Sequence, residues 1–315
     1  MAHRFFDLRS EQGVLRLSIA VTLFIAVIGV GFGLASGSFS IVFDGVYSLV
    51  DASMSGLSLV VVRLITAHTG AKRMSRKLRE RFTMGFWHLE PMVLALNGIL
   101  LTGVALYALI NAASSLLEGG RDLEFGVALV YAVLTVSACL AMAIVEARAN
   151  REINSDFVRM DVKGWVMSAS ITAALLIAFC FGIAVQGTEW QWLSPYIDPA
   201  VLGLVCLVIT PLPMSVVRQA LADMFLVTPS DLKQHVDDVA EAFVSRHGLE
   251  SYRAYVAKVG RSREIELYFI VPTSMSARTI TEWDAWRDEI GDAIGGEGPD
   301  RWLTVVFTGD PEWAE

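Results

Sequence analysis

Residues 41–67 read IVFDGVYSLVDASMSGLSLVVVRLITA, a stretch that is long and apolar enough to cross a membrane as a helix. Three oxygen-bearing side chains, Asp44, Tyr47 and Asp51, interrupt it at positions i, i+3 and i+7, which places them on one helix face. Ionisable groups at bilayer depth cost about 3 kcal/mol or more, so they normally face a bundle interior or an aqueous pathway. This face therefore predicts a place for a cation.

Five further apolar blocks of spanning length accompany this stretch, and 54% of the 315 residues are hydrophobic while only 18% are charged. Such a composition excludes an ordinary soluble protein. We expect six transmembrane helices, at residues 14–35, 41–67, 91–117, 125–145, 162–185 and 197–217. Pro211 and Pro213 should end or kink the sixth, because proline removes a helix hydrogen bond.

Basic residues alternate between the two sides of the predicted bundle. The segment between the second and third spans contains six of them (Lys72, Arg73, Arg76, Lys77, Arg79 and Arg81), and further arginines precede the first span and follow the fourth. The three remaining connections hold one basic residue, Arg121. The positive-inside rule then predicts a multi-pass protein of the cell membrane, plasma or bacterial inner membrane, with both termini in the cytoplasm.

The last part of the chain differs in character. Residues 228–315 carry 9 basic and 17 acidic side chains and so hold the whole net charge of −8. Their pattern predicts a helix starting near Ser230, strands at 252–259 and 264–271 joined by a turn at Gly260, a second helix at 279–294 and a strand at 302–307. We expect two domains: residues 1–227 with six helices, and residues 228–315 as a cytoplasmic α+β domain of order αββαβ.

Two carboxylates and a phenol are hard oxygen donors, which suit Mg²⁺, Mn²⁺ or Fe²⁺ at least as well as Zn²⁺. The alternative for Asp44, Tyr47 and Asp51 is a structural polar patch bonded to hydroxyl groups on neighbouring helices. The fifth span repeats the spacing with Asp161, Gly164 and Ser168. Here the alternative is helix packing, for which glycine and serine are common in membranes, with Asp161 acting as a helix cap or binding a basic loop residue.

Four other polar residues lie in or beside the spans. His88 and Glu90 stand at the start of the third span, where a structural ion pair with the basic loop is favoured over a metal or proton-relay role. Asn97 and Asp198 are interpreted as residues that form hydrogen bonds between helices.

Six spans with both ends inside, a basic loop after the second span and an αββαβ tail resemble the cation diffusion facilitator (cation efflux) family. Local segments strengthen the resemblance, which covers about residues 12–315. Phe43-Asp-Gly-Val-Tyr-Ser-Leu-Val-Asp51 looks like the second-helix motif, Gly85-Phe-Trp-His-Leu-Glu-Pro91 is similar to the third-helix entry, and Ser194-Pro-Tyr-Ile-Asp-Pro199 matches the start of the sixth helix.

The resemblance implies that Tyr47 and Asp51 form the second-helix half of a transport site, and that a ferredoxin-like tail mediates a homodimer. The family's other half is an H-x-x-x-D pair on the fifth helix. Gly164 and Ser168 occupy those positions here, so the chain is a divergent member that lacks the usual tetrahedral zinc site. A site rebuilt from Asp44, Asp51, Ser168 and Asp161 is the remaining possibility.

These expectations describe a divalent metal cation transporter that works by efflux, alternating access and ion coupling, with the cation as substrate. The alternative is a family member that no longer transports and serves as a structural or regulatory membrane partner. No enzymatic activity, bound cofactor or nucleic acid partner is expected, because six spans exclude a soluble enzyme and the chain shows no nucleophile or phosphate-binding motif.

Overall fold

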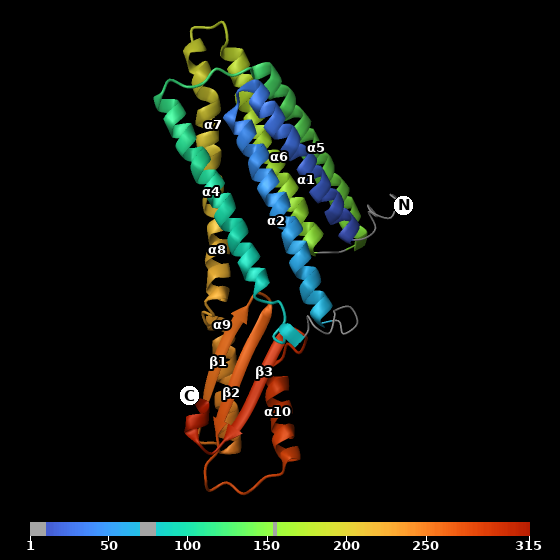
Figure 1. Cartoon of the computed structure of the whole chain (residues 1–315), viewed down its shortest axis with the longest axis vertical. Coiled ribbons are helices and arrows are strands. Elements are labelled where there is room, and N and C mark those ends of the chain that lie inside the picture. Colours follow the sequence, from blue (N-terminus) through green and yellow to red (C-terminus); the bar gives the residue numbers. More distant parts are fainter. Residues whose placement is uncertain (1–10, 70–79, 154–155) are drawn as a thin grey trace. The chain divides into compact units, whose positions relative to one another are not determined.

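The computed structural model describes residues 11–69, 80–153 and 156–315 of the chain. Within them, six helical segments are long and apolar enough to cross a membrane, which confirms the six predicted spans. Helices and strands follow one another along the chain as Figure 1 shows. The helices of the spans are α1 (Glu11–Ser36), α2 (Phe39–Thr69), α4 (Leu89–Leu117), α5 (Phe125–Ile153), α6 (Asp156–Val185), α7 (Ser194–Ile209) and α8 (Pro211–Met224).

The chain forms two compact units. One contains residues 1–57 and 96–216, and the other contains residues 58–95 and 217–315. The first unit holds all of α1, α5, α6 and α7. The predicted boundary between domains at residue 227 stays a prediction. Most of the predicted basic segment after the second span, residues 70–79, lies outside the described residues.

The sixth span is broken where the prolines predict a break. Helix α7 ends at Ile209 and α8 begins at Pro211, which has no backbone N–H to continue the hydrogen-bond ladder. The Thr210 hydroxyl donates to the Cys206 carbonyl at 2.7 Å and so supplies an additional bond at the end of α7. The chain continues as a helix beyond the predicted end of the span, to Met224.

Asp198 of α7 ties that helix to the beginning of α2. Its Oδ1 accepts a hydrogen bond from the Ser38 hydroxyl at 2.6 Å, and its Oδ2 accepts the backbone N–H of Phe39 at 3.0 Å. A carboxylate at a helix N-terminus satisfies an otherwise unpaired donor and complements the helix dipole. Asp198 thus forms the hydrogen bond between helices that the sequence predicts.

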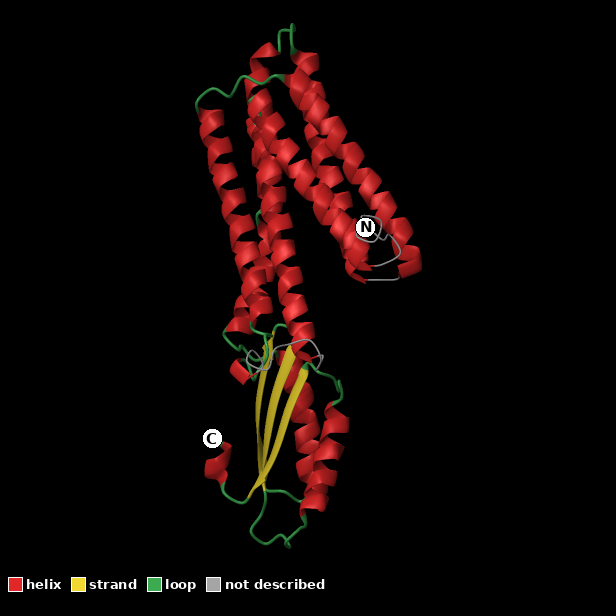
Figure 2. Cartoon of the chain, turned by 45° about the vertical axis from the view of Figure 1, so that its right-hand side comes forward, coloured by secondary structure: helices red, strands yellow, loops and turns green. Residues whose placement is uncertain are grey.

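The C-terminal segment folds in the predicted order αββαβ, as α9, β1, β2, α10 and β3. In the three-stranded sheet, β1 and β2 are antiparallel through a turn at Gly260, while β2 and β3 are parallel because the intervening chain crosses back through α10. Figure 2 shows these strands and helices. The bounds are Ser230–His247 for α9, Ser251–Val259 for β1, Ser262–Ile270 for β2, Ile280–Ile294 for α10 and Arg301–Thr308 for β3.

One hydrophobic core holds this segment together. Ile265, Leu267 and Phe269 alternate along β2 and face Phe243 of α9 and Trp286 of α10, so both helices cover the same face of the sheet. Helix α10 begins with a capping box in which Thr279 and Glu282 exchange hydrogen bonds, and the backbone N–H of Thr279 lowers the pKa of Glu282.

Glu90, at the start of α4, pairs with the turn between β1 and β2. The Arg261 guanidinium donates to its two carboxylate oxygens, with Nε to Oε2 at 3.0 Å and Nη2 to Oε1 at 3.1 Å. These hydrogen bonds raise the pKa of Arg261. Glu90 therefore forms an ion pair with the C-terminal segment, while the pairing predicted with the basic loop falls mostly on residues outside the described part of the chain.

Candidate cation site

The side chains singled out in the sequence surround one cavity inside the first unit. The cavity has a volume of about 210 Å³ and is enclosed by α1, α2, α5 and α6. All five candidate ligands line it: Asp44, Tyr47 and Asp51 from α2, and Asp161 and Ser168 from α6. The shared helix face predicted for α2 therefore does face the corresponding residues of the fifth span.

Asp51 connects three helices. It forms a hydrogen bond with Asn97 of α4 and interacts electrostatically with Asp161 of α6. The buried Oδ1 of Asn97 has no hydrogen-bond partner among the described residues, so the amide N–H₂ is the group that donates to Asp51. Asn97 thus forms the bond between helices that was predicted for it, to a carboxyl group that lines the cavity.

Asp44 has a partner that sequence reasoning missed. The fully buried Tyr131 of α5 donates its hydroxyl to Asp44 Oδ2 at 2.7 Å. The phenol lies close against α1, where a Cβ added to Gly29 would come within 2.8 Å of Tyr131 Oη. The sequence does contain a signal for this hydrogen bond. Tyr131 lies within an apolar span, and a tyrosine hydroxyl that becomes buried usually has a hydrogen-bond partner.

Gly164 does not serve helix packing. A Cβ built at this position has no heavy atom within 4 Å, so the residue faces open space in the cavity. The close helix approach occurs at Gly45 of α2, where an added Cβ would lie 2.9 Å from the Ala26 carbonyl oxygen of α1. The packing alternative considered for the fifth span is thus wrong for Gly164.

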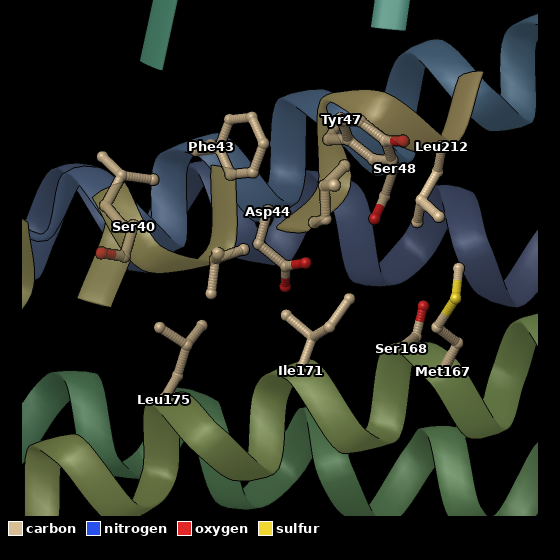
Figure 3. A pocket seen from close by; sticks show the side chains of 13 residues that line it. Ser40, Phe43, Asp44, Tyr47, Ser48, Met167, Ser168, Ile171, Leu175 and Leu212 are labelled. Atoms are coloured by element: carbon tan, nitrogen blue, oxygen red, sulfur yellow. The ribbon is translucent and has the colours of Figure 1, made fainter. Parts of the chain in front are cut away.

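A smaller apolar pocket of about 70 Å³ adjoins the cavity and shares Asp44, Tyr47, Ser48, Met167 and Ser168 with it. Figure 3 shows Asp44 of α2 and Ser168 of α6 pointing into the space between their helices. The rest of its lining is mostly apolar (Phe43, Ile171, Leu175, Leu202, Val205, Ile209 and Leu212, with Ser40). The polar residues thus lie at the border between an apolar space and the larger cavity.

Glu146 is a second residue that the sequence prediction missed. The predicted fourth span ends at Val145, one residue before Glu146, whereas α5 continues to Ile153 and Glu146 is completely buried. The Trp165 indole N–H of α6 donates to Glu146 Oε1 at 3.2 Å. Across residues 11–69, 80–153 and 156–315, no three His, Cys, Asp or Glu side chains lie close enough together to hold a metal ion.

Comparisons with known proteins show which family the chain resembles. The family model described as the cation efflux transmembrane domain matches residues 15–225. The chain is similar to the metal cation efflux system protein CzcD of Cupriavidus metallidurans, with 22% identity over 240 residues, which is 76% of this chain and 69% of the relative. The cation efflux system protein CzcD of an Alcaligenes species matches with the same identity and coverage.

We predict that Tyr131→Phe destabilises the protein by about 1–2 kcal/mol, because Asp44 loses the donor that satisfies it inside the bundle. Thermal unfolding of the purified protein in detergent measures the effect. Tyr107→Phe is the matched control, since the Tyr107 side chain is 64% exposed. Equal unfolding temperatures for Tyr131→Phe and the parent would show that the hydrogen bond to Asp44 contributes nothing to stability.

Proposed function

The chain belongs to the cation efflux family of transporters, and on that premise we propose that it carries a divalent metal cation, with Asp51 as the principal ligand. The family consists of transporters rather than enzymes, so the expectation that the chain is no enzyme is confirmed, as is the resemblance noted from its motifs. Membership of the family supports metal cation efflux across a membrane as the general function of the chain. The ion, its ligands, the coupling and the assembly are our proposals.

The cavity between α2 and α6 is the observation that carries this proposal. It gathers three carboxyl groups, a phenol and a hydroxyl in a region where ionisable groups are costly unless they have a function. The five candidate ligands are hard oxygen donors, which favour Mg²⁺, Mn²⁺ or Fe²⁺ over an ion that prefers nitrogen or sulfur, although the thiol of Cys139 also lines the cavity. We infer that Asp51 and Tyr47 bind the cation, with Asp44, Asp161 and Ser168 joining as the helices move.

Alternating access explains how such a site serves transport. In this structure the donors surround a cavity without forming a compact group, and helix rocking would close them around the cation before opening the other side. Export against a gradient needs an energy source, and we infer coupling to a second ion because the sequence has no phosphate-binding motif for a nucleotide. The distribution of basic residues supports cytoplasmic termini and a location in a bacterial inner or other cell membrane.

We predict that Asp51→Ala lowers cation flux to the rate of protein-free liposomes, because it removes the carboxylate proposed as the principal ligand. Uptake into proteoliposomes of Mn²⁺, Fe²⁺, Mg²⁺, Co²⁺, Cd²⁺ and Zn²⁺ measures the flux and identifies the ion. Asp122→Ala, at an exposed loop position, is the matched control. Flux of Asp51→Ala equal to that of the parent would refute the site. A parent that carries none of these ions would favour a structural or regulatory membrane partner.

A second prediction concerns selectivity. Gly164→His combined with Ser168→Asp restores a nitrogen and a carboxylate opposite Tyr47 and Asp51, and Gly164 faces enough space for the new side chain. We expect zinc affinity to rise at least tenfold, about 1.4 kcal/mol, as measured by calorimetry. Gly103→His is the control, because its added Cβ also meets nothing within 4 Å but Gly103 does not line the cavity. An unchanged affinity in a folded double variant would mean that these helix faces do not meet around the cation.

We also propose that the C-terminal segment holds two copies of the chain together as a homodimer. Its core is built from its own residues, so it has the means to fold alone. The sheet face opposite the helices exposes aromatic side chains, with Tyr255 48% and Trp302 49% exposed. A half-exposed aromatic face of this kind fits a second copy of the same segment.

We predict that isolated residues 228–315 form a dimer whose population increases with ionic strength. The segment carries eight excess acidic charges, and salt screens their repulsion as the Debye length falls from about 30 Å to about 10 Å. Sedimentation equilibrium measures the dimer. Trp302→Arg should weaken it, whereas Ile280→Arg at an exposed position of α10 should not. A strict monomer at high protein concentration and moderate salt would remove this segment from the assembly.

A further inference from the structure

Glu146 is fully buried in α5 at the place where this helix meets α1 and α6. Its side chain has 0% exposure, although no sequence feature marked it as functional. Trp165 of α6 donates one indole N–H to both Glu146 Oε1, at 3.2 Å, and Ser18 Oγ of α1, at 2.9 Å. The Ser18 hydroxyl also forms a hydrogen bond with Glu146. Three helices therefore hold this carboxyl group in one orientation.

The second oxygen of Glu146 is left without a donor. Among the described residues, Glu146 Oε2 and Asp161 Oδ2 are both buried and neither accepts a hydrogen bond. The two carboxyl groups nevertheless interact directly with each other. Two carboxylates that face each other away from water repel strongly, so a proton or another cation must be held between or beside their oxygens.

Asp161 links this pair to the cavity. It lines the cavity together with Asp51 and interacts with Asp51 electrostatically, whereas Glu146 interacts with Asp161 and does not line the cavity. A cation held by Asp51 can therefore pass to Asp161 without leaving the polar region. Ser18 Oγ lies beside the pair and is a further hard oxygen donor.

We propose that Glu146 and Asp161 form a second binding station for a hard divalent cation, which shares Asp161 with the Asp51 site and is entered through the cavity. The proposal rests on the proposed function, since it assigns this cation a second position on its route. Two carboxylates and a hydroxyl give the oxygen-only donor set that Mg²⁺ and Mn²⁺ prefer, with water completing the coordination. Trp165 acts as a positioning residue because it fixes Oε1 and leaves Oε2 to the ion.

Equilibrium binding of Mn²⁺ to the purified full-length protein tests the station. The Asp51→Asn variant should retain one bound Mn²⁺, because it removes the first site alone. Adding Glu146→Gln should abolish that remaining binding, and so should adding Asp161→Asn. Glu118→Gln, at an exposed position directly after α4, is the matched control and should leave it unchanged. Gel filtration and thermal unfolding check that each variant is folded. If the variant with Glu146→Gln does not fold, the variant with Asp161→Asn provides the test of the station.

Each result separates the station from the Asp51 site. The station is overturned if the folded Asp51→Asn/Glu146→Gln variant binds as much Mn²⁺ as Asp51→Asn, which is the result expected if the pair shares only a proton. It is also overturned if Asp51→Asn alone removes all Mn²⁺ binding, or if the parent binds none. The proposed function is judged independently, by the flux of Asp51→Ala in proteoliposomes.

Discussion

Carboxyl groups placed inside apolar helices impose the constraint on which this bundle depends, because each needs a partner from another helix. Asp44 of α2 accepts the phenol of Tyr131 from α5, and Asp198 of α7 accepts the Ser38 hydroxyl at the start of α2. Asp51 bonds with Asn97 of α4. Apolar contact alone gives little preference among helix neighbours in a lipid environment, so these polar bonds specify which helices meet α2.

Glycine sets the distances at which those bonds form. Gly29 of α1 and Gly45 of α2 allow backbone to approach backbone, and the same close approach leaves room for the Tyr131 hydroxyl beside Asp44. On the opposite side of α2, the surface that faces α6 is not filled in this way, and the cavity opens there. Helix α2 therefore packs tightly against α1 on one side, and on its other side its oxygen donors face the cavity.

Much of this arrangement follows from the sequence. The six spans, the αββαβ order and the common face of Asp44, Tyr47 and Asp51 depend on local periodicity, which is legible in one chain. The missed features depend on tertiary contact. Glu146 lies just after the predicted end of the fourth span, whereas α5 extends past Val145, and Glu90 finds Arg261, a partner 171 residues away, through folding of the C-terminal segment. The sequence alone suggests that Gly164 is a packing residue, and only the positions of the neighbouring helices show that it faces the cavity.

At Gly164, the size of the side chain and the stability of the fold are independent, although the two are usually linked in a protein interior. Most interior positions cannot change size without a loss of stability, since neighbouring atoms fill the volume around them. Gly164 lies on the cavity wall with nothing within 4 Å of an added Cβ. Selection can therefore exchange the side chain there at little cost in folding free energy. During evolution, such a chain can lose or regain a metal ligand at this position while the helix bundle keeps its fold.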